Sequence, residues 1–193
     1  MFKELLNRLL NNDQPSQRIL FEMFYQRIYN TAYFITQDHH AAHDVTQETF
    51  IKAFRQLHTL KDGNKMGAWL GRIAANTAAD YLRKIKRWND FSADDVFIEE
   101  EISKQQEAAS VDEIVEGNFI HELLYAKMSE LKPEYRQVLV LKYEFDMKDE
   151  EIAEALGVSA GTVKSRLYRA KNNLKSRIAE QLDEERRGSN ATT

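Results

Sequence analysis

Residues 149–177 constrain the fold of this chain more strongly than any other stretch. Ile152, Ala155 and Leu156 form an apolar stripe at helical spacing, which predicts a short first helix. Gly157 follows at once and ends that helix, because glycine enters the left-handed backbone conformation without a steric penalty. A short helix closed by a glycine turn is therefore expected here.

A second helix is predicted directly after the turn. Ser159 can cap its N-terminus, since a serine hydroxyl accepts a hydrogen bond from an unpaired backbone N–H. Its apolar stripe consists of Val163, Leu167, Ala170 and Leu174. Residues 160–177 hold six Lys or Arg and no Asp or Glu, on a chain with a net charge of −4. This pattern is typical of a helix-turn-helix whose second helix enters the DNA major groove. A helical packing unit with a solvated basic face is the alternative.

The composition predicts an all-α fold. Only two Pro and seven Gly occur among 193 residues, and long segments are rich in good helix formers. The absence of cysteine excludes disulfides and thiolate zinc sites. No apolar run approaches the roughly 20 residues needed to span a bilayer, and the charges at Lys3, Glu4 and Arg8 argue against a secretory signal. We therefore expect a cytoplasmic protein without direct membrane insertion.

The first of two small helical domains is expected over residues 1–88. A short amphipathic helix ends near residue 12, and longer helices are predicted over residues 15–38, 41–58 and 68–88. Ser16 is expected to cap the helix that follows Pro15. A polar loop with an Asp-Gly turn separates the last two helices.

The end of the helix over residues 68–88 is strongly basic. Its cations are Arg83, Lys84, Lys86 and Arg87. Cations near a helix C-terminus are favoured by the helix dipole, so these residues could serve only to stabilise the helix end. Four cations in five residues exceed what capping requires, and Trp69, Arg72, Asn76, Tyr81 and Trp88 add aromatic, amide and cationic groups. This mixture suits single-stranded nucleic acid, in which bases stack on rings and phosphates contact Lys or Arg.

Asp44, Gln47 and Glu48 lie within about one helical turn and form an acidic surface that also carries an amide. Periodicity alone favours a solvated helix face as its interpretation.

Three histidines in the same region invite a metal hypothesis. His39 and His43 are spaced i, i+4 and could share a metal ion, but no clear third ligand accompanies them or His40. The chain also has no phosphate-binding glycine loop and no spacing that suggests a nucleophile and base. We therefore expect no metal, no cofactor and no enzymatic activity.

Residues 89–118 differ sharply in composition, with ten Asp or Glu and one lysine. We interpret them as an acidic flexible linker. The second domain is expected over residues 119–182, with a helix to residue 131 and another opened by Pro133 ahead of the helix-turn-helix. Residues 183–193 are expected to form a disordered tail.

Two motifs carry a family resemblance. Residues 44–57, DVTQETFIKAFRQL, and 69–87, WLGRIAANTAADYLRKIKR, resemble region 2 of the extracytoplasmic-function (ECF, group 4) sigma factors. Residues 131–175, LKPEYRQVLVLKYEFDMKDEEIAEALGVSAGTVKSRLYRAKNNLK, resemble region 4 of the same family, the small bacterial transcription initiation factors. The helix-turn-helix alone would be less specific, because response regulators share a similar one. The two motifs in this order, separated by an acidic linker, are specific to the family. A free-standing helix-turn-helix regulator that does not need polymerase is the alternative.

The resemblance implies a role for each matching position. Asp44, Gln47 and Glu48 match the helix that binds the clamp helices of the largest subunit of core RNA polymerase. The positions that match recognition and melting of the −10 element are Lys61, Asn64, Lys65, Arg72, Asn76, Arg83, Lys84, Lys86 and Arg87. The positions that match recognition of the −35 element are Thr162, Lys164, Ser165, Arg166, Tyr168, Arg169 and Lys171.

The resemblance also implies partners and a cellular role. The chain would bind core polymerase, including the flap of the second largest subunit, and direct it to promoters of a stress or envelope-type regulon. An anti-sigma factor would hold it inactive, in some cases at the membrane, and the active protein would associate with the nucleoid. Trp69 is expected to pack in the core. Gly71 occupies a position that is often aromatic in the family, which makes the packing there thinner.

Overall fold

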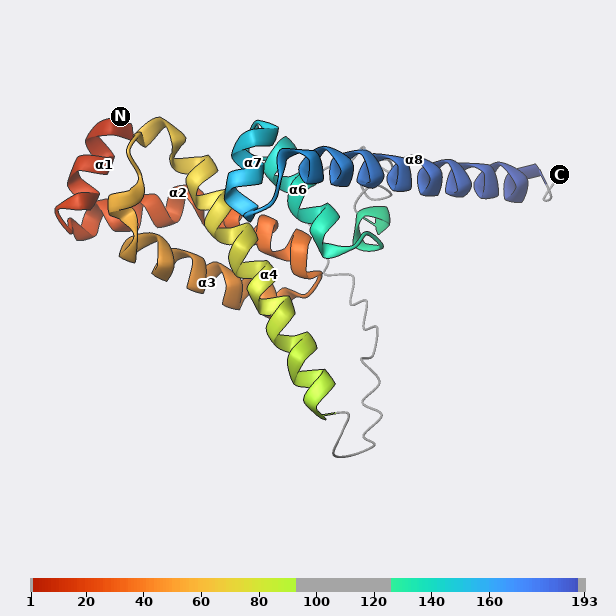
Figure 1. Cartoon of the computed structure of the whole chain (residues 1–193), viewed down its shortest axis with the longest axis horizontal. Helices are drawn as coiled ribbons and strands as arrows, with labels where there is room; N and C mark the ends of the chain where they lie inside the picture. The colour runs from red at the N-terminus through yellow and green to blue at the C-terminus, as the bar shows by residue number, and fades with distance from the viewer. Residues whose placement is uncertain (1, 93–125, 191–193) are drawn as a thin grey trace.

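The computed structural model describes residues 2–92 and 126–190, which form helices joined by turns (Figure 1). The helices of these residues are α1 (Phe2–Leu10), α2 (Gln14–Thr36), α3 (His39–Arg55), the 3-10 helices η1 (Leu57–Thr59) and η2 (Gly63–Lys65), α4 (Met66–Ser92), α6 (Pro133–Tyr143), α7 (Asp149–Leu156) and α8 (Ala160–Asn190). The all-α prediction is confirmed. Most of the predicted linker, and the predicted helix up to residue 125, lie outside the described residues.

The first helical unit comprises α1 to α4. Helices α2, α3 and α4 pack against one another, and α1 lies against α2 and η2. Apolar residues spaced along each helix form its core, including the fully buried Leu20, Ile28, Ile35, Val45 and Leu70. The predicted helices are therefore present, and their boundaries are set by capping residues.

Asp13, rather than Ser16, caps α2. The Asp13 carboxylate accepts the backbone N–H of Ser16 at 3.1 Å and also its hydroxyl. The helix begins at Gln14 because Pro15 fits the first turn, so Ser16 lies inside the helix and is buried. Asp38 caps α3 in the same way, through a 2.6 Å bond from the N–H of Ala41.

The second unit comprises α6, α7 and α8, and its helix-turn-helix is confirmed. Gly157 adopts the left-handed conformation, with φ 63° and ψ 36°. The Ser159 hydroxyl accepts the N–H of Thr162 at 3.1 Å and caps α8. Val163 and Leu167 are buried against α6 and α7, as the apolar stripe predicted.

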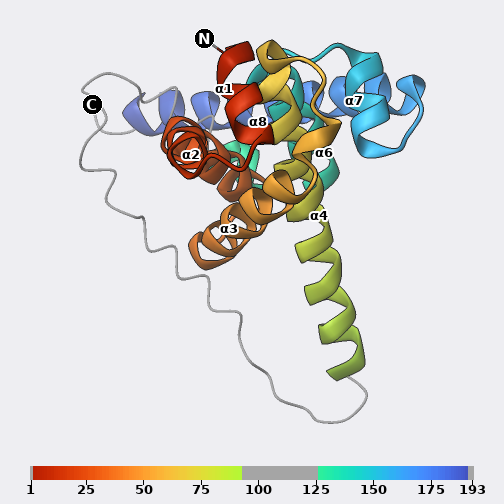
Figure 2. The ribbon, with the colours of Figure 1, turned by 90° about the vertical axis from the view of Figure 1, so that its left-hand side faces the viewer.

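Two helices extend beyond their predicted ends. Helix α4 continues to Ser92, and its C-terminal half projects away from the other helices (Figures 1 and 2). Helix α8 continues to Asn190, so residues 183–190 are helical and the expectation of a disordered tail is corrected for them. This segment contains Glu and Arg, which favour helix, and it continues a helix that has already formed.

The two units pack against each other. Helix α6 lies against α2 and α4, and α7 lies against α4 (Figures 1 and 2). Their buried residues form one continuous apolar core, which includes Leu70 of the first unit and Leu141 of the second. Sequence patterns predicted the two units but not their contact.

Candidate nucleic-acid interface

The outward face of α8 carries the predicted duplex-binding residues. Lys164, Ser165, Tyr168 and Arg169 are all exposed, with Tyr168 at 68% of its full exposure. Their spacing of i, i+1, i+4 and i+5 places them together on one side of the helix. The turn and cap hold the helix, so this face is free to enter a major groove.

Three other predicted positions on α8 lie at the margin of this face. Thr162 and Arg166 are half-buried. Lys171 is exposed, and its ammonium lies 5.3 Å from the centroid of the Tyr143 ring. This distance permits a cation–π contact, which holds Lys171 near the end of α6.

Charged contacts at the start of α7 hold the first helix of the motif. Lys142 Nζ lies 2.8 Å from Asp149 Oδ1, and this hydrogen bond raises the pKa of Lys142. The Glu151 carboxylate accepts the Lys148 backbone N–H at 2.9 Å, and mainly this bond lowers the pKa of Glu151. Negative charge in the first turn of α7 is also favoured by the helix dipole.

The basic end of α4 is fully presented to solvent. Arg83, Lys84, Lys86 and Arg87 are exposed, and Arg83 forms an ion pair with Asp80 one turn earlier. The segment that carries them is the projecting half of α4 (Figure 2). A surface of this charge can contact nucleic-acid phosphates.

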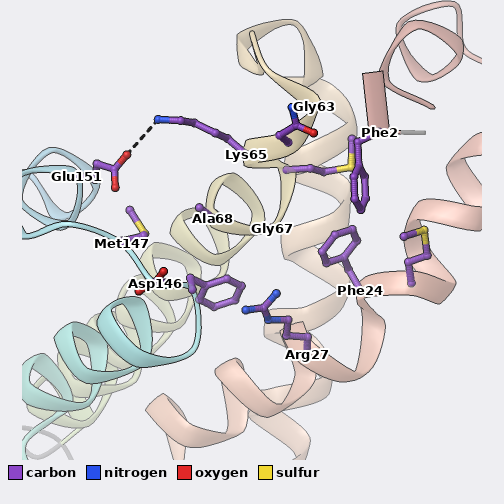
Figure 3. A pocket seen from close by; sticks show the side chains of 14 residues that line it. Phe2, Phe24, Arg27, Gly63, Lys65, Gly67, Ala68, Asp146, Met147 and Glu151 are labelled. Carbon is purple, nitrogen blue, oxygen red and sulfur yellow. Dashed lines mark hydrogen bonds and ion pairs between the residues drawn. The ribbon is translucent and has the colours of Figure 1, made fainter. Parts of the chain in front are cut away.

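The remaining residues predicted to bind the −10 strand differ in their environment. Lys61 and Asn64 are exposed around η2, and Arg72 is half-buried on α4. Lys65 forms a 3.1 Å ion pair with Glu151 of α7 (Figure 3). Asn76 donates a 2.8 Å hydrogen bond from Nδ2 to the carbonyl oxygen of Ala155, also in α7. Two residues predicted to bind nucleic acid, Lys65 and Asn76, therefore contact the second unit in this structure.

Trp69 belongs to the core, as predicted. It is only 8% exposed, and its indole Nε1 donates to Thr59 Oγ1 at 3.1 Å. This bond ties the start of α4 to η1 and so positions the loop between them.

The acidic surface on α3 is exposed. Asp44, Gln47 and Glu48 point to solvent between buried positions such as Val45 and Thr49. Glu48 lies 3.6 Å from Lys52 in an i, i+4 pair. The three side chains can therefore contact a partner without rearrangement of the core.

The histidines of α3 contact tyrosines of α2. His39 Nδ1 lies 2.7 Å from the Tyr29 hydroxyl, and His43 Nδ1 lies 3.2 Å from the Tyr25 hydroxyl. Within the described ranges, 2–92 and 126–190, no group of three or more His, Cys, Asp or Glu side chains could hold a metal ion.

Sequence reasoning missed a cluster between α2, α4 and the α6–α7 turn. Arg27 of α2 pairs with Glu144 at 2.7 Å and donates to the Glu144 carbonyl oxygen. Its guanidinium also lies 4.5 Å from the centroid of the Phe145 ring. These residues are 117 or more positions apart in sequence, so no local pattern links them. Arg27 borders a cavity of about 520 Å³ between the two units (Figure 3).

Two buried polar residues of α6 were also missed. Arg136 donates to the carbonyl oxygens of Ile35, Ser129 and Leu131, and burial lowers its pKa to about 10. Gln137 donates from Nε2 to the carbonyl oxygen of Ala75 at 2.8 Å. Both side chains therefore join the second unit to the backbone of the first.

Two protein-family models match the chain, one over each helical unit. The model of Sigma-70 region 2 matches residues 20–88, and the model of Sigma-70 region 4 matches residues 121–174.

None of the helices in the described part of the chain is long and apolar enough to cross a membrane.

Curated relatives and solved structures agree with these matches. The chain is 32% identical to the ECF RNA polymerase sigma factor SigM of Bacillus subtilis, over 81% of this chain and 91% of that protein. It is 27% identical to SigW of the same organism, over 92% and 97%. The sigma factor RpoE, solved in complex with the anti-sigma factor NepR from Bartonella quintana, aligns with a TM-score of 0.62 and 25% identity, over 82% and 94%. The chain therefore belongs to the ECF RNA polymerase sigma factors.

Proposed function

We propose that the chain binds core RNA polymerase through α3 and brings two DNA-reading surfaces to a promoter. The observation that carries this proposal is the exposed α8 face of Lys164, Ser165, Tyr168 and Arg169, held by the Gly157 turn. Membership of the sigma factor family supports the same reading. Polymerase supplies the catalysis, and the chain itself is not an enzyme.

The second unit would read the duplex at the −35 element. Arg169 and Lys164 can donate to guanine O6 and N7, and each good bidentate contact contributes about 1–3 kcal/mol of discrimination. Tyr168 and Ser165 are beside them, and Arg166 and Lys171 would contact phosphates. This assignment divides the chain into a region 2-like unit up to residue 88 and a region 4-like unit from residue 119.

The first unit would bind the unwound strand of the −10 element. Asn64 is exposed and can bond to the edge of an extruded base, at a cost of a few kcal/mol for unstacking. Lys61, Lys65 and Arg72 would contact the strand nearby, and the basic end of α4 would hold its phosphates. Asn76 would join them once it is released from Ala155.

The acidic face of α3 would dock on polymerase. Asp44 and Glu48 can pair with cations on the clamp helices of the largest subunit and so set the docking register. The second unit would contact the flap of the second largest subunit. Since polymerase and the chromosome are in the bacterial cytoplasm, we propose that the chain works there. The similar RpoE was solved with an anti-sigma factor, which supports an anti-sigma partner for this chain.

Run-off transcription tests the proposal directly. The purified chain is added to bacterial core polymerase that lacks other sigma factors, on a genomic-fragment library. Discrete 5′ ends that share two spaced upstream elements are expected. Failure to bind core polymerase would contradict the proposal and favour a free-standing regulator.

A further inference from the structure

The loop that joins α3 to α4 is anchored at regularly spaced positions. Leu60, Gly63 and Met66 are buried, three residues apart. The positions between them are exposed, namely Lys61, Asp62, Asn64 and Lys65. We call residues 60–65 the reading loop. Its buried anchors therefore decide how its polar side chains are presented to solvent.

Helix α1 lies directly against the central anchor. A Cβ atom added at Gly63 would lie 2.6 Å from the carbonyl oxygen of Phe2, closer than real atoms approach, and 3.1 Å from the backbone nitrogen of Lys3. Figure 3 shows Phe2 beside Gly63. The backbone of Gly63 does not adopt a positive φ, so glycine is required here for space and not for conformational freedom.

Helix α1 is itself fixed to the core of the first unit. Leu6 and Leu9 are buried, and Phe2 and Leu5 pack against the same cluster. Positions 2, 5, 6 and 9 fall on one face of a helix. The helix contacts α2 as well as η1 and η2. The backbone that meets Gly63 therefore belongs to a packed helix, which cannot move aside as a flexible side chain can.

The reading loop has few bonds of its own. The Asp62 carboxylate accepts the N–H of Asn64 at 2.9 Å, and the Asp62 carbonyl oxygen accepts the N–H of Lys65 at 3.0 Å. These bonds form the single turn η2, and a 3-10 turn this short is weak without support from its surroundings. The support comes from α1, through Gly63.

We propose that α1 is a positioning element for base reading, which holds the reading loop in the conformation that presents Lys61 and Asn64 to the −10 strand. The inference rests on the proposed role of these two residues in binding that strand. Helix α1 precedes residues 20–88, the part of the chain that matches the region 2 model. A loop that is ordered before binding loses less conformational entropy on binding, so α1 would contribute to affinity and base discrimination without touching DNA.

Two substitutions separate the loop from α1, one from each side. Gly63→Ala places a methyl group against the backbone of α1, and Leu9→Ala removes a leucine that is only 1% exposed from α1 itself. Gly67→Ala is the control for the first, since a Cβ atom at this next glycine would lie 3.4 Å or more from its neighbours. Leu10→Ala is the control for the second, since this adjacent leucine is 47% exposed.

Hydrogen exchange of the full chain, followed by mass spectrometry, measures how often the loop opens. Exchange across residues 60–66 should become several-fold faster in Gly63→Ala and Leu9→Ala and should not change in either control. Exchange in α6 should stay at the parent rate, which checks that the core remains folded. Leu9→Met keeps the side-chain volume and should restore the parent rate. If one of the two variants does not fold, the other tests the proposal with its own control.

Binding of single-stranded DNA by the holoenzyme is the second readout. The probes are a non-template-strand oligonucleotide that carries the −10 element of a promoter mapped by run-off transcription, and the same oligonucleotide with that element scrambled. The ratio of the two affinities should fall roughly five- to tenfold in Gly63→Ala, as expected when one base contact is misplaced. Affinity for the scrambled oligonucleotide should not change, because the basic end of α4 is untouched.

Two results would overturn the inference. Unchanged exchange in folded Gly63→Ala and Leu9→Ala would mean that α1 does not hold the loop. Faster exchange with an unchanged affinity ratio would mean that order in the free loop does not contribute to base reading. Failure of the proposed function has a different signature, because Lys61→Ala and Asn64→Ala would then leave the affinity ratio unchanged while the loop stays ordered.

Discussion

The Arg136 guanidinium donates two hydrogen bonds to the carbonyl oxygen of Ile35, from Nε at 3.1 Å and from Nη2 at 2.7 Å. Ile35 lies in the last turn of α2, where backbone carbonyls have no partner within the helix. A cation at this end is also favoured by the helix dipole. Arg136 of the second unit therefore caps a helix of the first.

We predict that Arg136→Lys lowers the free energy of unfolding by roughly 2–3 kcal/mol, because a single ammonium cannot replace a planar group that bonds three carbonyl oxygens. Urea denaturation followed by circular dichroism measures the change. Arg18→Lys is the control, since Arg18 is an exposed member of an i, i+4 pair. Equal unfolding midpoints for Arg136→Lys and the parent would contradict the prediction.

The same buried contacts mark the limit of what the sequence could predict. The helix-turn-helix followed from local chemistry: a glycine that tolerates a positive φ, a serine cap and an apolar stripe. The contact of Phe145 with Gly71 and the Arg136 bonds depend on which helix faces which, and that is decided by the packing of the whole core. Asn76 illustrates the difference, since its sequence neighbourhood predicted binding of single-stranded nucleic acid while its position in the fold gives it a protein partner.

Arg169→Ala should weaken transcription selectively through the −35 element. Arg169 is exposed on the outer face of α8, and loss of one good base contact reduces discrimination by about 1–3 kcal/mol. Run-off transcription on matched and scrambled −35 templates measures it. Lys175→Ala, an exposed cation farther along the helix, should keep the parent's preference; an unchanged preference in Arg169→Ala would disprove the assignment.

Glu48→Lys should abolish binding to core polymerase and leave the fold intact. Glu48 is exposed on α3, so the new cation does not disturb the core but repels a cationic docking surface. Co-purification with core polymerase measures binding. Glu4→Lys is a matched control because Glu4 is also the acid of an exposed i, i+4 pair, with Arg8. Retained co-purification of Glu48→Lys would refute the docking surface on α3.

Acidification should favour separation of the two units. The pKa of Glu151 is lowered from 4.5 by the Lys148 N–H first and by Lys65 second. A carboxyl group whose pKa is lowered in the folded protein adds stability at pH values above its usual pKa. This stability is lost as the pH falls through the lowered pKa. The bond from Lys148 lies at the start of α7, within the second unit. Only the part of the pKa shift that Lys65 causes therefore depends on the packing of the two units.

The effect of pH on the packing of the two units should be small. Lys65 and Glu151 are both partly exposed, and exposed ion pairs contribute about 0–1 kcal/mol of stability. The separation of the units is measured from pH 7 down to pH 4. The readout is fluorescence energy transfer between labels on cysteines introduced at the exposed positions His58 and Asn173 of this cysteine-free chain. We expect a decrease that is weaker in Glu151→Gln, which has no charge to lose. An identical decrease in both proteins would show that Glu151 is not responsible.

Gly71 makes the contact between α4 and the α6–α7 turn a feature that a single mutation can remove. Glycine codons differ from alanine codons by one nucleotide, and any side chain at this position collides with the ring of Phe145. Drift at that codon would force the ring away from α4, while the hydrogen bonds of Arg136 and Gln137 still join the two units. Within a lineage of such proteins, the residue at position 71 would then indicate which members seat an aromatic ring of the second unit against α4 and which pack the two units without it.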